Sequence, residues 1–179
     1  TPRIARNSAL AQAEVLIFTD IKRGDMAALA GAYAALIGAS GGGALGLFTA
    51  IRRLRSTYAR IADRLARDGL PLYAQHVDPI DTDTLVDIFR DDPHASLLGT
   101  DALRDGVDVP GASLRLVVME QVPWPRPDIL HRARRLSYGG TDYDDRIIRA
   151  KLAQAFGRLI RSAGDKGHFV LLSSAVPSR

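Results

Sequence analysis

Short apolar runs alternate with stretches of helical periodicity along most of the chain. The apolar runs predict β-strands at residues 15–18, 44–48, 70–74, 95–99, 114–119 and 169–172. Between most of these runs, apolar residues recur at steps of three and four, as they do in helices that pack on a core. This alternation favours an α/β fold of three layers, with a mainly parallel central sheet and helices on both faces.

Four helices are expected between the strands. Residues 26–37 are rich in alanine, a third helix can begin at Asp81 or Thr82 and end near residue 89, and a fourth can begin at Thr141 or Asp142 and end near residue 162. The second helix carries its apolar face at Ile51, Leu54, Tyr58, Ile61 and Leu65. Because parallel sheets bind ligands at the carboxyl ends of their strands, the loops after residues 48, 74, 99 and 119 are the candidate binding loops.

The length and composition fit one globular domain. The chain has 179 residues, of which 46% are hydrophobic and 25% charged. We therefore expect a single domain over residues 1–179, with residues 1–25 as a possible edge strand or lead-in. Residues 26–51 carry no charge and are long enough to cross a bilayer, but their alanines and their glycine run disfavour a membrane span.

The charge balance is basic and points to an anionic partner. The formal net charge is +4, only three of the 24 basic residues are lysine, and residues 126–179 hold eleven basic and five acidic residues. Arginine suits bidentate contact with phosphate. The absence of cysteine excludes a disulfide, a thiol nucleophile and a thiolate-bound metal in this sequence. No signal-peptide pattern opens the sequence, so a cytoplasmic location is expected.

Several familiar catalytic patterns are absent or misplaced. The run Gly41-Gly42-Gly43-Ala44-Leu45-Gly46 matches G-x-G-x-x-G, but it precedes an expected strand instead of following one, so a flexible connection is favoured over a dinucleotide site. The sequence holds no G-x-x-x-x-G-K-[ST] phosphate loop and no G-x-S-x-G nucleophile elbow. Its four histidines are scattered, and no metal site is expected.

The segment 98–111, with the sequence LGTDALRDGVDVPG, runs from an expected strand directly into polar loop residues. At the carboxyl end of a strand, the Thr100 hydroxyl and free backbone N–H groups can bind a phosphate. Asp108 can accept a hydrogen bond from a ribose hydroxyl or orient an arginine. The alternative interpretation is a polar turn that ends in Pro-Gly.

The segment 154–161, with the sequence QAFGRLIR, places hydrogen-bond donors away from the apolar face of the last expected helix. At 100° per residue, Gln154, Arg158 and Arg161 lie within about 60° of one another. Gly157 inside a helix costs about 1 kcal/mol relative to alanine, which suits close packing against another group. The alternative is a solvated basic face.

Three segments, taken in their order along the chain, resemble the second RecA-like lobe of superfamily 2 DNA helicases of the DinG and XPD kind. Residues 45–50, LGLFTA, look like the L-x-L-F-T-S segment that opens that lobe; residues 100–111 look like motif V, T-x-x-x-x-x-G-V-D-V-P-G; residues 154–161 match motif VI, Q-x-x-G-R-x-x-R. The resemblance covers about residues 44–172 and implies a RecA-like three-layer sandwich. The sequence differs from the family at Ala50, where serine is usual, and at Leu103-Arg104-Asp105, which replaces an aromatic residue, Trp and Glu.

The resemblance implies the second motor lobe of an ATP-dependent DNA helicase that acts in DNA repair. A first RecA-like lobe of the same polypeptide would bind most of ATP and Mg²⁺, and this lobe would close over them. Arg161 would be the arginine finger, a role worth roughly 10³–10⁵ in rate. Arg158 would contact the γ-phosphate and Gln154 would align both arginines. The other ATP-binding residues that the resemblance implies are Gly106, Asp108 and Gly157.

The same resemblance implies contacts with single-stranded DNA at Thr49, Arg52 and Thr100, and translocation as the cleft closes and opens. Trp124, the only tryptophan, can stack on a base, but a proline-stiffened loop whose tryptophan covers the core is favoured. The isolated chain is expected to hydrolyse no ATP. The competing hypothesis is a non-catalytic nucleic-acid or protein-binding module on the same fold.

Overall fold

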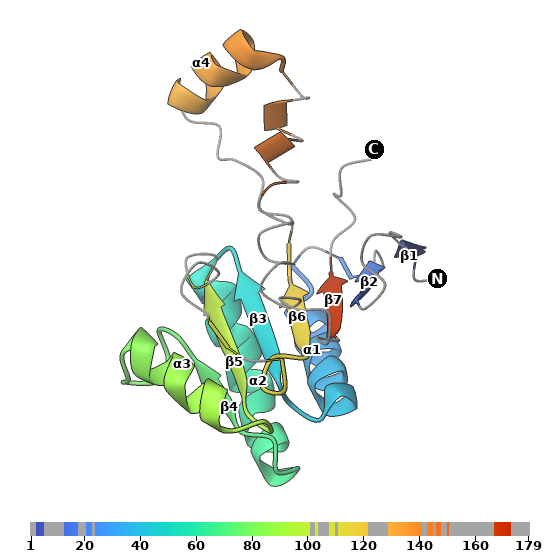
Figure 1. Ribbon diagram of the computed structural model, residues 1–179, viewed down its shortest axis with the longest axis vertical. Helices are drawn as coiled ribbons and strands as arrows, with labels where there is room; N and C mark the ends of the chain where they lie inside the picture. The colour runs from blue at the N-terminus through green and yellow to red at the C-terminus, as the bar shows by residue number, and fades with distance from the viewer. Residues whose placement is uncertain are drawn as a thin grey trace.

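The described residues form a seven-stranded sheet with helices on both faces (Figure 1). The computed structural model describes residues 3–5, 13–17, 21–22, 24–100, 103, 108–109, 111–121, 129–140, 143–144, 146–147, 150 and 167–172. The strand order is β1-β2-β7-β6-β3-β5-β4. The strands are β1 (Arg3–Ala5), β2 (Ala13–Ile17), β3 (Ala44–Phe48), β4 (Leu72–Ala74), β5 (Ser96–Thr100), β6 (Leu116–Met119) and β7 (Gly167–Leu171).

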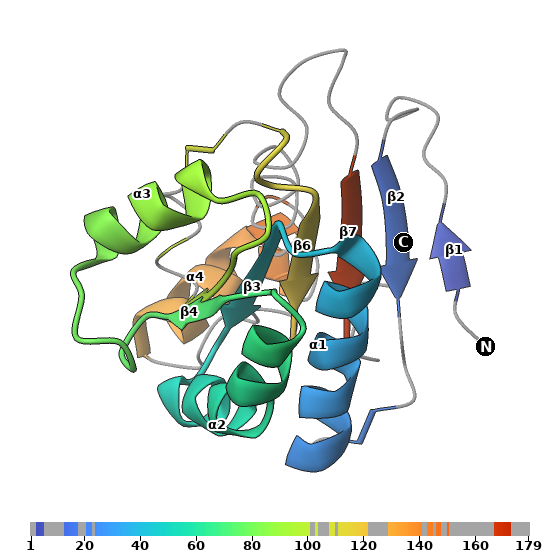
Figure 2. The same cartoon turned by 90° about the horizontal axis from the view of Figure 1, so that it is seen from below.

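Every neighbouring pair of strands is parallel except β1 and β2, which pair antiparallel at one edge. Helices α1 (Met26–Ser40) and α2 (Ile51–Arg67) lie on one side of the sheet, and α3 (Thr82–Asp91) lies on the other (Figure 2). The predicted α/β architecture with a mainly parallel sheet is therefore confirmed.

The alternation of side chains along β3 explains why the sheet has two cores. Leu45 and Leu47 are buried on the α3 face, whereas Ala44 and Phe48 are buried among residues of α1 and α2. Between them, Gly46 permits a close approach, because a Cβ there would lie 2.6 Å from Leu98 Cδ2. Both faces of this central strand are covered, which is why its sequence is an unbroken apolar run.

Helix α1 ends at a glycine turn, three residues beyond the predicted end. Asp25 caps its start, because the Asp25 side chain accepts a hydrogen bond from the Ala28 N–H at 2.9 Å. At the other end Gly41 has φ 67°, the left-handed conformation that favours glycine. A Cβ on Gly42 would lie 2.2 Å from the His94 carbonyl oxygen. The glycine run is therefore a tight connection from α1 into β3 and not a dinucleotide loop.

The uncharged stretch 26–51 divides into α1, this turn and β3. Among the residues that the structure describes, no helix is both long enough and apolar enough to cross a membrane.

Helix α4 (Ile129–Tyr138) lies in a segment where no helix was predicted. In Figure 1 it lies beyond the end of β6, away from the sheet. The predicted helix from Thr141 or Asp142 to residue 162 falls largely outside the described residues, although residues 143–144, 146–147 and 150 are helical. The predicted strand 44–48 matches β3, and the other predicted strand boundaries differ from the structure by at most two residues.

Candidate nucleic-acid interface

The carboxyl ends of β3 and β5 bring together the three residues expected to contact DNA. Phe48 pairs with Thr100 in the parallel register, so Thr49 and Thr100 lie at the same edge of the sheet on adjacent strands. Arg52 lies in the first turn of α2, which starts directly after β3, and its side chain is exposed. Residues far apart in sequence therefore meet at one edge, as the strand-end rule predicts. Their DNA contacts stay a prediction.

A buried carboxylate organises the β3 side of this edge. Glu120, the residue after β6, accepts hydrogen bonds at Oε1 from the Thr49 N–H at 3.1 Å and from Thr49 Oγ1 at 2.8 Å. Its Oε2 accepts from Arg53 Nε at 2.9 Å. The Glu120 side chain is fully buried, so these bonds and the ion pair with Arg53 compensate a charge that would otherwise be costly in the interior.

A second group of hydrogen bonds, centred on Gln75, fixes the carboxyl end of β5. The side-chain oxygen of Gln75 accepts from both the N–H and the hydroxyl of Thr100, each at 3.1 Å. The Gln75 amide donates to Thr82 Oγ1 at 3.2 Å, which links β5 to the start of α3. The next residue, His76, has φ 65°, a strained conformation for a residue with a side chain. The β5 side of the edge is therefore held by hydrogen-bonded side chains.

Two stacked aromatic rings lie next to the carboxyl end of β3. Tyr33 of α1 stacks on Phe48 with ring centroids 5.0 Å apart, and its hydroxyl donates to the Val118 carbonyl oxygen at 3.4 Å. Burial raises the pKa of Tyr33 well above its ordinary value, and the charge of Glu120 raises it further. Tyr33 therefore stays neutral and acts as a rigid support.

The start of α2 offers backbone donors at the same edge. The first N–H groups of a helix have no intrahelical partner. Ala50 occupies the N-cap position and provides no side-chain hydrogen bond to them. The positive end of the α2 dipole also lies there. Uncapped donors beside the exposed Arg52 make this the part of the edge best suited to an anion.

The nucleotide-binding predictions lie mostly outside the described residues: Gly106, Gln154, Gly157, Arg158 and Arg161. Trp124 lies outside them as well. Asp108 is described and exposed, and its backbone carbonyl accepts from Arg90 of α3, from Nε at 3.3 Å and from Nη2 at 3.1 Å. Its predicted role towards ATP therefore stays a prediction.

Leu103, which stands where the family usually has a bulkier residue, is part of the core. It is buried, and a Cβ on Gly99 would lie 2.2 Å from Leu103 Cδ2. Leu103 therefore packs directly against β5 at Gly99.

Sequence reasoning missed Glu120, Arg53 and Gln75, which hold the edge together. Glu120 carried a signal, because it is one of only two glutamates and directly follows a buried strand whose carboxyl end had been singled out. Arg53 carried little sequence signal, because it is one of several arginines on α2. Gln75 follows β4 and could have been found by the same strand-end argument.

The parallel sheet, its two helical layers and its polar carboxyl edge define a RecA-like α/β domain. The family described as "Helicase C-terminal domain" matches residues 33–177, and the chain belongs to this family, as a DinG/XPD-like second lobe of superfamily 2 helicases. The predicted resemblance is confirmed.

Three similar proteins illustrate the relationship. The ATP-dependent helicase DinG of Mycobacterium tuberculosis is 38% identical over 148 residues, which are 79% of this chain and 22% of that protein. A solved structure titled XPD helicase matches with a TM-score of 0.64 and 22% identity, over 90% of this chain and 31% of that chain. The helicase MrfA, solved bound to DNA, matches with a TM-score of 0.61 and 14% identity, over 90% of this chain and 21% of that one. The chain therefore spans about a fifth of the length of the curated relatives it matches.

Proposed function

We propose that the chain is the second motor lobe of an ATP-dependent DNA helicase and that single-stranded DNA binds at the carboxyl edge of its sheet. The observation that carries the proposal is the meeting of Thr49, Thr100 and the exposed Arg52 at one edge, next to the uncapped start of α2. The names of the DinG relatives and the DNA-bound MrfA structure support it. We further propose DNA repair as its setting and the cytoplasm as its location.

The hydrogen-bond donors at this edge have different proposed roles. A phosphodiester only accepts hydrogen bonds, so it needs protein groups that donate. Both threonine hydroxyls already donate to side-chain oxygens, those of Glu120 and Gln75. Phosphate binding therefore falls to Arg52 and to the first N–H groups of α2, while Thr49 and Thr100 hold the two strand ends in place.

ATP would be bound between this lobe and a first RecA-like lobe of the same polypeptide. As the resemblance to this helicase family implies, we assign Mg²⁺ to the first lobe. Arg161 and Arg158 would reach the phosphates from this lobe, with Gln154, Gly157, Gly106 and Asp108 around them. Cleft closure would then favour one of two lobe arrangements and advance the strand.

A salt titration tests the proposal. A labelled oligothymidylate is titrated into the 179-residue chain at low and moderate salt. We expect weak binding whose affinity falls as salt rises, because each neutralised phosphate of a single strand contributes a slope of about −0.7 in log K against log salt. An affinity that salt leaves unchanged would contradict binding through phosphates.

A further inference from the structure

Arg53 and Glu120 form the one ion pair with a fully buried carboxylate among the residues that the structure describes. Arg53 Nε lies 2.9 Å from Glu120 Oε2, and the two side chains are 19% and 0% exposed. The other ion pair found there, between Arg90 and Asp87, lies on the exposed surface of α3. A carboxylate this deeply buried holds its partner arginine in one orientation.

The guanidinium of Arg53 is only partly used by this pair. Arginine has five N–H donors in a planar fork. Nε donates to Glu120, and the described residues provide no further partner for Arg53. Among the described residues, nothing occupies the Nη1 and Nη2 edge, which can bind two oxygens of one phosphate, and the side chain is not fully buried.

The same carboxylate links Arg53 to the predicted DNA edge. Glu120 binds both the N–H and the hydroxyl of Thr49 through Oε1, while Oε2 holds Arg53. Arg53 lies in the first turn of α2, next in sequence to Arg52. Arg52 is exposed, so a ligand must order its side chain, whereas Arg53 is already held and loses less conformational freedom on binding.

We propose that Arg53 binds a backbone phosphate of single-stranded DNA through its Nη edge and that Glu120 is its positioning residue. The inference rests on the proposed function and adds a binding residue and its support. Glu120 cancels the net charge of Arg53 without occupying its outer donors, so the pair recognises phosphate by geometry more than by charge.

A charge-neutral double variant tests this directly. Arg53→Gln/Glu120→Gln removes both charges, keeps the formal net charge at +4 and leaves no unpaired charge in the interior. Arg60→Gln/Asp63→Asn is the matched control, because it also removes one charge of each sign from α2 at exposed positions two to three turns further along the helix. Oligothymidylate affinity is measured over a series of salt concentrations, with thermal unfolding of each variant.

The Arg53/Glu120 variant should bind about tenfold more weakly at low salt, while its salt slope stays close to that of the wild type because the net charge is unchanged, and the control should behave like the wild type. Wild-type affinity in both variants would overturn the inference and leave the proposed function intact. If the wild-type chain itself shows no salt-dependent binding, the proposed function fails first.

Two single variants keep the test decisive if the double variant unfolds. Arg53→Lys keeps the charge and the ion pair but loses the fork, and should bind about threefold more weakly. Glu120→Gln removes a negative charge beside the DNA, which by charge alone would tighten binding; if Glu120 positions Arg53, binding weakens instead. Unchanged binding of Arg53→Lys together with tighter binding of Glu120→Gln would overturn both roles.

Discussion

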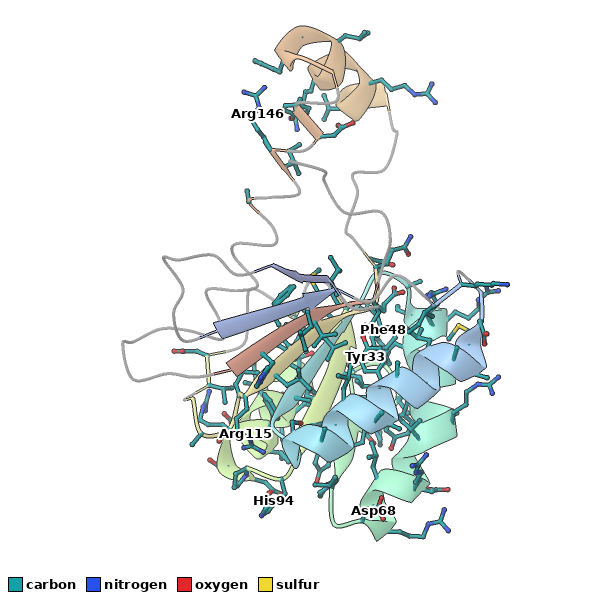
Figure 3. The ribbon with its side chains drawn as sticks, turned by 90° about the vertical axis from the view of Figure 1, so that its right-hand side faces the viewer. Tyr33, Phe48, Asp68, His94, Arg115 and Arg146 are labelled. Atoms are coloured by element: carbon teal, nitrogen blue, oxygen red, sulfur yellow. The ribbon has the colours of Figure 1, made fainter. Side chains whose placement is uncertain are left out.

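The two edges of the sheet hold arginine in opposite ways. At the amino edge, Arg115 donates to four backbone carbonyls: Nη1 to Ala112, and Nη2 to Ser40, Gly41 and Pro93 at 3.2, 3.0 and 2.9 Å. At the carboxyl edge, the one side-chain hydrogen bond that Arg53 makes to a described residue runs from Nε to the Glu120 carboxylate. Figure 3 shows Arg115 and His94 at one end of the sheet and Phe48 towards the other.

We interpret this difference as one between an arginine that supports the fold and an arginine at the proposed binding edge. Arg115 closes the amino edge, because its charge lies against the last carbonyls of α1, where a cation is favourable, and its guanidinium fills the space beside Gly43. At the carboxyl edge, Arg52 is exposed and Arg53 is partly exposed, whereas the Glu120 carboxylate is buried. Arginine content alone therefore says little about where nucleic acid binds; what matters is which acceptors each arginine already has.

The largest expected effect of a substitution concerns a third arginine, Arg161, which is predicted to act on ATP and belongs to neither edge. In the two-lobe protein, Arg161→Ala should lower DNA-stimulated ATP turnover by about 10³ or more, with a smaller effect on ATP affinity, because a finger acts mainly in the transition state. Arg161 falls off the apolar face of its predicted helix, so thermal stability should hardly change. Turnover near wild type with a fall of several degrees in Tm would make the residue structural and favour the non-catalytic module.

Loss of the Arg115 side chain should show the opposite pattern. Arg115→Ala leaves four carbonyls without their donor and should lower the free energy of unfolding by about 2–4 kcal/mol, measured by urea denaturation. DNA affinity of the folded protein should not change. Weaker DNA binding at unaltered stability would mean that the amino edge is also a binding surface.

The glycine turn at the amino edge should be nearly as sensitive. Gly42→Ala should cost about 2–3 kcal/mol, because φ is 88° and the new Cβ would meet the His94 carbonyl. Gly69→Ala is the control: its φ is 75°, but its surroundings are open, so only the backbone strain of about 1 kcal/mol remains. Equal losses of stability would show that backbone conformation, and not the contact with His94, dominates.

The smallest effect concerns the cap of α3 behind the carboxyl edge. The Asp81 side chain accepts from the Thr84 hydroxyl and from the Thr84 N–H, and these bonds lower the pKa of Asp81. A lowered pKa means that the cap stabilises the fold above the ordinary pKa of aspartate and that this contribution is lost as the pH falls through the lowered value. Asp81→Asn should therefore flatten the acid side of the stability profile slightly; an identical profile would show that the charge has no role.

The positions of the strand ends could be predicted from the sequence, whereas the side-chain contacts that join these ends could not. Apolar runs that stop at Thr49 and Thr100 mark two neighbouring loops, because parallel strands end at one edge. The Arg53–Glu120 pair joins residues 67 positions apart, and no periodicity reports such a contact. Helix α4 did carry signals, since Asp128 precedes it and Gly139 with φ 105° follows it, but Leu136 and Tyr138 are exposed and give no core pattern.

The most direct test of the account compares the two ends of one helix. Arg52 lies at the carboxyl edge, and Arg67 lies in the last turn of α2, about 22 Å further along the axis. Asp68, the next residue in the sequence, is labelled in Figure 3. Both side chains are exposed, so Arg52→Gln and Arg67→Gln each remove one surface charge. Oligothymidylate affinity should fall about fivefold for Arg52→Gln, with the salt slope reduced by about 0.7, and should stay at the wild-type value for Arg67→Gln. Equal losses in both variants would show that binding follows overall charge and would contradict a binding site at the carboxyl edge.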